Sequence, residues 1–451
     1  GGTVGIISRN GGMQGVVNLI ADWADNARRA CLATAAMGLA VFFDDYANTL
    51  VVGNTMRPVT DSMGVSRAKL AYIVDSTAAP VATLALVTTW IGYQVGLIGE
   101  SLAHLPDLDS EAYLLFLSTI PYSFYPLLAI AFVFMIASSG RDFGPMAKSE
   151  AAARLNGVHA QSHLDSSMAE DCEPIEAIAG KPLRAINAAL PIMMLIFGVM
   201  GGLYVTGKAG VGAEDASLRD IIGAADSYKA LMWGSMIGMI TAALITMAQR
   251  IMSLEDVVNA WYKGVRSMFF AMIILILAWA LGGITEEMRT ADFLVSVLGD
   301  TLPVQLLPVI VFFLAAFTAF ATGSSWGAMG ILIPLAIPLT WAVMKANGYS
   351  GPEDMHILYS SIAGVLAGSV WGDHCSPISD TTILSSMASG CDHIEHVRTQ
   401  MPYAIVVAMV AIVTCLVPVA YGLPWWIGLG TGAALLYLIL RVVGRKPPEA
   451  L

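Results

Sequence analysis

The chain has 451 residues, of which 56% are hydrophobic and 13% are charged, and its formal net charge is −11 at pH 7. Soluble domains carry about 25% charged residues, so this composition excludes a soluble globular protein and indicates a polytopic membrane protein. The negative net charge argues against nucleic-acid binding, because proteins that bind nucleic acids are usually basic. The five cysteines show no Cys-x-x-Cys spacing, so we expect them to be reduced packing residues.

The first ten residues, GGTVGIISRN, contain neither a starting methionine nor the pattern of a signal peptide. They look like the end of a membrane helix. We therefore expect the first transmembrane repeat, residues 1–138, to lack one or more N-terminal helices.

Two interrupted apolar segments follow in this early part of the chain. Residues 30–43 are apolar and lead into the polar stretch 44–49, after which the apolar pattern resumes. The next apolar segment is interrupted at 75–80, where an aspartate, a serine and a threonine precede Pro80. Backbone at bilayer depth can leave a helix only where protein or a water-filled cavity satisfies its polar groups. Each interruption therefore marks a place of special structure.

The middle of the chain connects the two halves. Residues 111–138 form a plain apolar span, and the polar stretch 139–184 carries five basic residues near its two ends, which predicts a cytoplasmic linker. Residues 185–289 are expected to be connecting transmembrane helices, with spans at 185–206, 230–248 and 268–283. The mixed charged and apolar segment 253–263 fits a helix lying at the membrane interface.

The late part, residues 290–451, is expected to form a second repeat. An apolar segment from 303 to 321 meets the polar stretch 322–327, and a small-residue segment from 360 is interrupted between Gly372 and Asp380. Gly372 and Pro377 supply the second interruption. Two plain spans follow at 402–421 and 425–443. The fold expected is all-α and polytopic, with about 10–12 transmembrane segments.

The interruptions recur as one pair in each half of the chain. Interrupted hydrophobic segments at corresponding places in two halves are typical of the binding site of a secondary transporter. We therefore predict that the interruptions at 44–48, 75–80, 322–326 and 372–380 converge near the middle of the membrane. Whether the two repeats are inverted or parallel stays open.

Three motifs carry a family resemblance: GDHCSPISDTTILSS at 372–386, TGSSWG at 322–327 and FFDDYANTL at 42–50. They resemble the NhaC family of Na⁺/H⁺ antiporters, within the wider ion-transporter superfamily. The expected lack of N-terminal helices would be a departure from that family. The resemblance implies a cation-coupled secondary active transporter of the cytoplasmic membrane that exchanges sodium ions for protons and needs no other cofactor. Some branches couple ions to amino acids or to hydroxy and carboxylic acids, which is the alternative function.

The partners expected are sodium ions, protons and the lipid bilayer. A small amino-acid or carboxylate substrate and a second copy of the chain in a homodimer are further expectations. No nucleic acid is expected.

Sodium is a hard cation that prefers carboxylate, hydroxyl and carbonyl oxygens, and these are the groups that the interruptions provide. The expected ion or substrate ligands are Asp373, Ser376, Ser379, Asp380, Thr381, Thr382, Asp75, Ser76, Thr77, Asp45, Asn48, Thr49, Thr322, Ser324 and Ser325. Sodium itself is expected at Asp373, Ser376 and Thr382, and proton coupling at Asp373, His374 and Asp75. An intramembrane carboxylate is expensive to keep charged, so a proton and Na⁺ would compete for it.

Some of these residues also have structural interpretations. Asp380 stands where the N-cap of the second half-helix would lie. His374 fits a neutral, hydrogen-bonded histidine as well as a proton carrier. Asp75 is also placed to pair with Lys69 or Arg67.

Asp44 and Asp45 are adjacent and so point to different faces of a helix. We favour the face of Asp45 and Thr49 for the cavity. The hydroxyls at 322–325 also fit close helix packing through small residues.

Potential metal ligands, Cys391, His393, Glu395 and His396, follow Gly390. We expect a solvated loop at the membrane edge there instead of a metal site.

An intramembrane hydrolase that uses Cys375, His374 and Asp373 is a less favoured alternative. The members of a catalytic triad usually come from separate segments of a chain, and a hydrolase does not explain the paired interruptions. No G-x-x-x-x-G-K-[ST] motif is present, which argues against a nucleotide-driven pump. We therefore expect a transporter and no enzymatic activity.

Overall fold

The computed structural model describes residues 2–156 (apart from 22, 43, 87, 106 and 109), 177–211, 221, 225–266 and 303–447, with isolated residues between 269 and 293. Within these ranges the regular structure is helical, apart from one isolated bridge between Asp142 and Arg445. Six described helices are long and apolar enough to cross a membrane, or seven if α8 and α9 form one bent span. The all-helical membrane fold is confirmed. The predicted span 268–283 lies mostly outside the described residues.

The described helices are α1 (Gly2–Arg9), α2 (Gly12–Ala21), α3 (Ala27–Ala40), α4 (Asp45–Ser62), α5 (Arg67–Ser76), α6 (Ala79–Ala82), α7 (Thr89–Ala103), α8 (Ala112–Thr119), α9 (Phe124–Ser139), α10 (Gly144–Asn156), α11 (Ile186–Val211), α13 (Ser227–Ala248), α14 (Leu254–Arg266), α17 (Leu307–Thr322), α18 (Ser325–Ala346), α19 (Met355–Cys375), α20 (Asp380–Ser389), α21 (His393–Val410), α22 (Val417–Ala420) and α23 (Trp425–Val443). A π-helix, Ala411–Leu416, joins α21 to α22.

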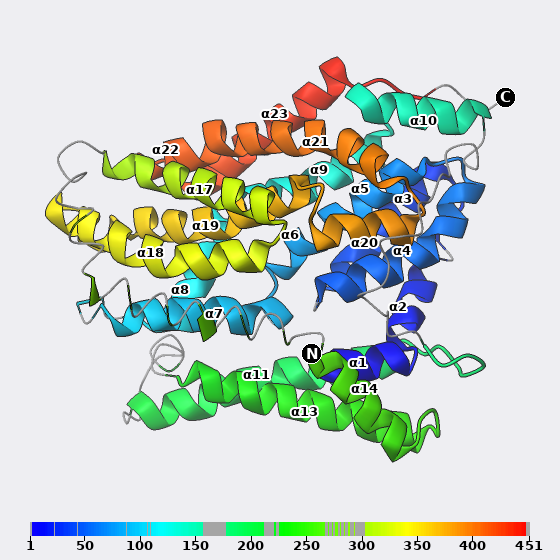
Figure 1. Ribbon diagram of the computed structural model, residues 1–451, viewed down its shortest axis with the longest axis horizontal. Helices are drawn as coiled ribbons and strands as arrows, with labels where there is room; N and C mark the ends of the chain where they lie inside the picture. The colour runs from blue at the N-terminus through cyan, green and yellow to red at the C-terminus, as the bar shows by residue number, and fades with distance from the viewer. Residues whose placement is uncertain are drawn as a thin grey trace.

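The first interruption of the late half is the tip of a helical hairpin. Figure 1 shows α17 and α18 side by side on the left of the molecule, and both helices contact α19. The chain turns at Gly323, whose φ of 68° is in the left-handed region that favours glycine. The Ser324 hydroxyl then accepts a hydrogen bond from the amide of Gly327 and caps α18. The predicted interruption at 322–327 is therefore the tip of a hairpin between two helices.

The first interruption of the early half is a similar turn. α3 ends at Ala40 and α4 begins at Asp45, with the Asp44 carboxylate accepting a hydrogen bond from the amide of Ala47 as the N-cap. The break thus precedes the predicted stretch 44–48, whose residues after Asp44 are helical.

The second interruption of each half breaks a helix, but at slightly different residues from those predicted. α5 ends at Ser76, and α19 continues through Gly372 to Cys375, so the helix-free residues are 376–379. Gly372 serves packing instead of the break, because a Cβ there would overlap the carbonyl oxygen of Ala316 in α17. Glycines every fourth residue bring α19 against α17 in this way: Gly364, Gly368 and Gly372 face Pro308, Phe312 and Ala316.

The two halves have opposite directions. The guanidinium of Arg67, at the start of α5, donates to the carbonyl of Gly390 just after α20. The hydroxyl of Thr382, at the start of α20, lies 3.5 Å from the carboxylate of Asp75 near the end of α5. α5 therefore runs antiparallel to α20, which carries on beyond the break in the direction of α19 (Figure 1). The hairpins α3–α4 and α17–α18 enter from opposite ends, so the repeats are inverted.

A buried ion-pair network holds the first turn of α5. The Lys69 ammonium lies 2.7 Å from Asp142 and 3.6 Å from Glu150 of the α9–α10 region.

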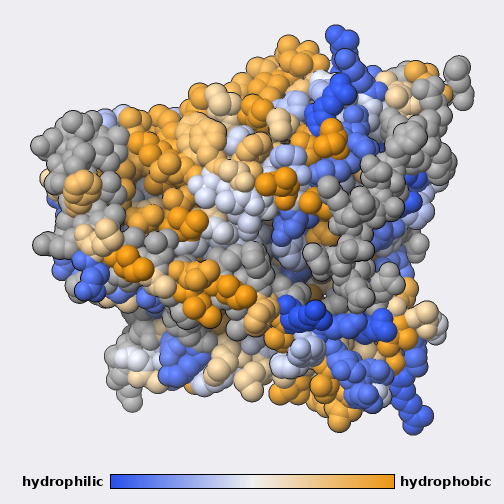
Figure 2. All heavy atoms as spheres, in the orientation of Figure 1, coloured by the Kyte–Doolittle hydropathy of each residue, from blue (hydrophilic) through white to orange (hydrophobic). Residues whose placement is uncertain are grey.

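A second helical layer of α1, α2, α11, α13 and α14 packs below this core in Figure 1. In Figure 2 hydrophobic side chains gather over the left of the molecule, where α17 exposes Leu314 and Phe317.

Candidate functional site

The Asp373 carboxylate lies in the last turn of α19 and is held from the start of α20. The Ser379 hydroxyl donates to its Oδ1 atom at 2.8 Å, and the Thr381 hydroxyl donates to Oδ2 at 2.9 Å. All three residues are buried. The helix-free residues 376–379 fold the hydroxyls of the second half-helix back onto the end of the first.

Asp75, near the end of α5, meets the same break. Its Oδ2 atom accepts a hydrogen bond from Gln400 at 2.5 Å and lies 3.4 Å from Nε2 of His396 and 3.8 Å from Nε2 of His374. The Thr382 hydroxyl lies between the two aspartates, 3.5 Å from Oδ2 of Asp75 and 3.4 Å from the carbonyl oxygen of Asp373.

Neither basic residue proposed as a structural partner of Asp75 contacts it. Lys69 pairs with Asp142 and Glu150, and Arg67 pairs with Asp61. That alternative interpretation is therefore wrong.

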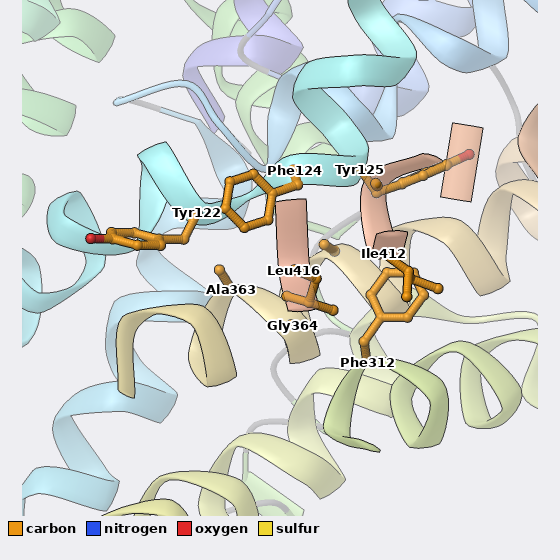
Figure 3. A pocket seen from close by; sticks show the side chains of 10 residues that line it. Tyr122, Phe124, Tyr125, Phe312, Ala363, Gly364, Ile412 and Leu416 are labelled. Carbon is orange, nitrogen blue, oxygen red and sulfur yellow. The ribbon is translucent and has the colours of Figure 1, made fainter. Parts of the chain in front are cut away.

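His374 is fully engaged by hydroxyl groups. Its Nε2 atom lies 3.0 Å from the Ser76 hydroxyl and its Nδ1 atom 2.7 Å from the Tyr125 hydroxyl. Figure 3 shows that Tyr125 borders a small, mainly apolar cavity beside the π-helix and that its hydroxyl points away from it. The contacts of His374 fit a hydrogen-bonded histidine, one of its two interpretations, but in the last turn of α19 and not within the break.

A second pair of carboxylates comes together where the α3–α4 turn meets the start of α20. Tyr46 donates a hydrogen bond to Asp380, and the indole of Trp90 donates to Asp45 at 3.1 Å. Asp380 is the first residue of α20 and follows the N-cap position, which Ser379 occupies. Its interpretation as an N-cap is therefore wrong.

The neighbouring aspartates of α4 have separate roles. Asp44 caps α4 and accepts a second hydrogen bond from Thr89 at 3.2 Å, while Asp45 faces Trp90 and lies within electrostatic range of Asp380. Of the two aspartates, Asp45 is therefore the one whose side chain lies toward Asp380 of the late half. It lies on the helix face that the sequence analysis favoured.

Asn48 joins the two early interruptions. Its side-chain amide donates to the carbonyls of Gly38, Val41 and Thr77, at 2.7, 3.1 and 3.0 Å. The Thr49 hydroxyl donates to the carbonyl of its own helix at Asp45, and that of Thr77 bonds α5 in the same way. These residues shape the turn and do not contact Asp373.

Other predicted ligands are placed away from the carboxylates. The Ser376 hydroxyl donates to the carbonyl of Phe320 at 2.8 Å and locks the hairpin tip to the break. Thr322 is exposed and bonds its own helix, Ser324 caps α18, and Ser325 is buried in the first turn of α18. The hydroxyls on Asp373 thus belong to Ser379 and Thr381 instead of Ser376.

The sequence analysis did not predict His396 or Gln400 as site residues. It placed His396 on a solvated loop and did not single out Gln400. Both are buried on α21, which begins at His393 instead of 402. His393 itself bonds Ser386 and the carbonyl of Pro377. The available signal was the spacing of His396, Gln400 and Tyr403, which places polar groups on one face of an apolar span.

The contacts of the described residues do not form the catalytic arrangement that the hydrolase alternative requires. Both ring nitrogens of His374 contact hydroxyls of Ser76 and Tyr125. Cys375 is buried, and among the described residues no base forms a hydrogen bond with its thiol. A nucleophile and its base must lie within hydrogen-bond reach.

The electrostatics of the site are unusual for buried carboxylates. Asp45, Asp75 and Asp373 are buried, and Asp380 is largely so. In the described part of the chain, the ion-pair partners of these four residues are His374 and His396, with no lysine or arginine. Buried charge is costly unless it is paired, so the cluster is suited to reversible binding of a proton or a metal cation.

Comparisons with known proteins show the family to which the chain belongs. The family model described as the Na⁺/H⁺ antiporter family matches residues 81–418. An uncharacterised protein of Haemophilus influenzae is 37% identical over 395 residues, which cover 86% of this chain and 71% of that protein. A Malate-2H(+)/Na(+)-lactate antiporter of Bacillus subtilis is 28% identical over 150 residues, which cover 33% of this chain and 30% of that protein.

An Arginine/ornithine antiporter, ArcD, of Halobacterium salinarum is 32% identical over 114 residues, 24% of this chain and 21% of that protein. These two named antiporters therefore match only a part of their length. The crystal structure of the Alcanivorax borkumensis YdaH transporter superposes with a TM-score of 0.50 at 13% identity, covering 99% of this chain and 86% of that one. That likeness concerns the fold alone.

Proposed function

The chain belongs to the Na⁺/H⁺ antiporter family, and from that premise we propose that it exchanges sodium ions for protons across the cytoplasmic membrane. Family membership makes it a multi-pass membrane transporter. The observation that supports the specific exchange is the meeting of Asp75 and Asp373 around Thr382, with the hydroxyls of Ser379 and Thr381 on Asp373 and, among the described residues, no lysine or arginine paired to either carboxylate.

Competition for one site would couple the two ions. With Na⁺ bound, the Asp373 carboxylate is ionised and the hydroxyls of Ser379, Thr381 and Thr382 turn oxygen lone pairs toward the cation. With a proton bound, Asp373 is neutral, and its carboxyl O–H donates to one of these hydroxyls while its other oxygen still accepts a hydrogen bond. Because the helix dipole of α19 ends at this point with partial negative charge, it favours a cation there.

Alternating access would follow from the inverted repeats. Two hairpin tips approach the site from opposite ends, one beside Asp45 and the other beside the break at 376–379. Movement of either tip opens the site toward its own side. Inverted repeats support this kind of symmetrical opening.

A second candidate function is Na⁺- or H⁺-coupled transport of an amino acid or a hydroxy or carboxylic acid. It is favoured by the relatives named as malate/lactate and arginine/ornithine antiporters. It would use the same cation site.

Purified protein in sealed liposomes separates the two. A pH-sensitive dye inside the vesicles reports proton movement when NaCl is added outside, with malate, lactate, arginine and ornithine supplied one at a time. Sodium alone should move protons, and choline chloride should not. Proton movement only in the presence of one of the organic substrates would replace Na⁺/H⁺ exchange by the second function. No response to sodium, with or without these substrates, would refute Na⁺/H⁺ exchange and the Na⁺-coupled form of the second function.

A further inference from the structure

An open cavity of about 580 Å³ lies in the second helical layer, far along the chain from the carboxylate site. It is bounded by the end of α1, the segment before α11, the end of α13 and the start of α14. Its lining residues are Arg9, Ile178, Lys181, Met247, Arg250, Ile251, Met252, Ser253 and Asp256. The lining thus comprises three cations, one carboxylate, four apolar side chains and one serine, in a chain whose net charge is −11.

The walls of the cavity are held in place by several hydrogen bonds. The carbonyl of Arg9 accepts from the amide of Ile178 at 3.2 Å, which docks the segment before α11 onto α1. The Lys181 ammonium donates to the carbonyl of Arg250 at 3.0 Å, which docks it onto the end of α13. The lone carboxylate, Asp256, accepts from both the amide and the hydroxyl of Ser253. The backbone segments that carry these cations are therefore held in place by hydrogen bonds.

Arg250 has an unusual backbone. Its φ is 54°, and it is the one non-glycine residue with positive φ in the described part of the chain. A side chain in this left-handed region is strained, and glycine adopts it more easily. Arg250 follows the C-cap of α13, and the amide of Ile251 donates to the carbonyl of Thr246, so the left-handed residue ends the helix in a Schellman motif. Its side chain lines the cavity.

The helix beside the cavity has the features of an interfacial helix. α14 buries Val257, Ala260 and Gly264 against α1 and exposes one outward face, which carries Leu254, Val258, Trp261 and Tyr262. Aromatic and apolar side chains on such a face lie at the boundary between headgroups and acyl chains. The cavity opens at the first turn of this helix, so it lies at headgroup depth.

In Figure 2 hydrophilic side chains gather at the lower right of the molecule, the corner where α13 and α14 meet in Figure 1. A basic cavity beside an interfacial helix, lined in part by apolar side chains, matches an amphiphile with a negative head. We propose that this cavity binds the phosphate headgroup of an anionic phospholipid, with Arg9, Lys181 and Arg250 contacting the phosphate and the apolar lining contacting the first acyl carbons. Cytoplasmic basic pockets between membrane helices are known sites of this kind.

Native mass spectrometry of the full chain tests the proposal. Protein purified in a zwitterionic detergent is titrated with dioleoyl-phosphatidylglycerol and, separately, with dioleoyl-phosphatidylcholine. Wild type should retain phosphatidylglycerol more tightly. Each cation removed should weaken that binding about five-fold, since one basic residue near an anionic surface contributes about 1 kcal/mol. Lys181→Gln combined with Arg250→Asn should therefore weaken it about 25-fold.

Matched variants separate binding from folding. Asn and Gly tolerate positive φ, so Arg250→Asn and Arg250→Gly should keep or raise the melting temperature while losing lipid affinity. Arg250→Lys keeps the charge and the strain and should keep most of the affinity. Lys229→Gln, which removes an exposed cation at the other end of α13, should leave it unchanged.

Three results would overturn the proposal. They are equal retention of the two lipids by wild type, full retention by the double variant, and displacement of phosphatidylglycerol by low millimolar glycerol phosphate. The last result would identify a soluble phosphate as the ligand instead of a lipid. None of these measurements depends on ion exchange, so they stand apart from the test of transport.

Discussion

The Nε2 atom of His396 on α21 lies 3.4 Å from the Oδ2 atom of Asp75 on α5. Gln400, one turn further along α21, donates to the same oxygen and also to the carbonyl of His374 in α19. One carboxylate thus connects α5, α19 and α21. Any movement of α5 during transport must either carry α21 with it or exchange these contacts.

Replacing Asp373 by asparagine should abolish Na⁺-driven proton movement while the protein still folds. Asn keeps the shape of the side chain, and one oxygen remains to accept from Ser379 or Thr381, but the group no longer titrates or carries charge. The dye-reported pH change in liposomes should fall to that of protein-free vesicles. The melting temperature should stay within a few degrees. Asp107→Asn, at an exposed residue paired with Lys345, is the control and should exchange normally. Full exchange by folded Asp373→Asn would remove this residue from the mechanism.

Gln400→Leu should lower both stability and the response to sodium. The substitution leaves the buried Asp75 carboxylate without its amide donor, and an unsatisfied buried polar group costs about 1–3 kcal/mol. The checks are a thermal melt and the dependence of exchange on Na⁺ concentration. Gln249→Leu, at an amide in the second helical layer, should leave the Na⁺ dependence unchanged. If Gln400→Leu leaves both measurements at wild-type values, the amide does not support the site.

Gly372→Ala should destabilise the protein by about 1–3 kcal/mol, the usual cost of overpacking. A Cβ there would overlap the carbonyl of Ala316 and push α17 away from α19, which displaces the hairpin tip beside the break. The matched control is Gly430→Ala in α23, where nothing lies within 4 Å of the added carbon. Thermal melts of the two variants should separate them, and equal melting temperatures would contradict the close packing.

The inverted arrangement predicts that the two hairpins open toward opposite sides. Ser62, where α4 ends, and Ser350, just before α19, are both exposed. In a Cys172→Ser background, where the four described cysteines are buried, a cysteine at 350 should react with an impermeant maleimide added to intact cells. A cysteine at 62 should react only after lysis, because Ser62 lies at the end of the bundle that holds the predicted cytoplasmic linker. Labelling of both from one side would rule out the inverted topology.

The amino-acid sequence alone was enough to place the interruptions within a few residues. Polar groups are so costly inside a membrane that local composition marks where a helix must stop. The stretch from Asp373 to Thr382 and the aspartates at 45 and 75 were found on that ground. The early break was displaced to 41–44, and Gly372 proved to be helical, because caps and close packing decide where a helix ends.

Tertiary structure alone decided the rest. A turn such as Gly323 permits either a kink or a reversal, and only packing against α19 makes it a hairpin. The direction of the repeats and the positions of His396 and Gln400 depend on contacts between residues more than 300 positions apart. The spacing of His396 and Gln400 marks a polar face of α21, but the chain does not show which residue that face contacts, because Asp75 appears there as one more polar residue in an apolar helix.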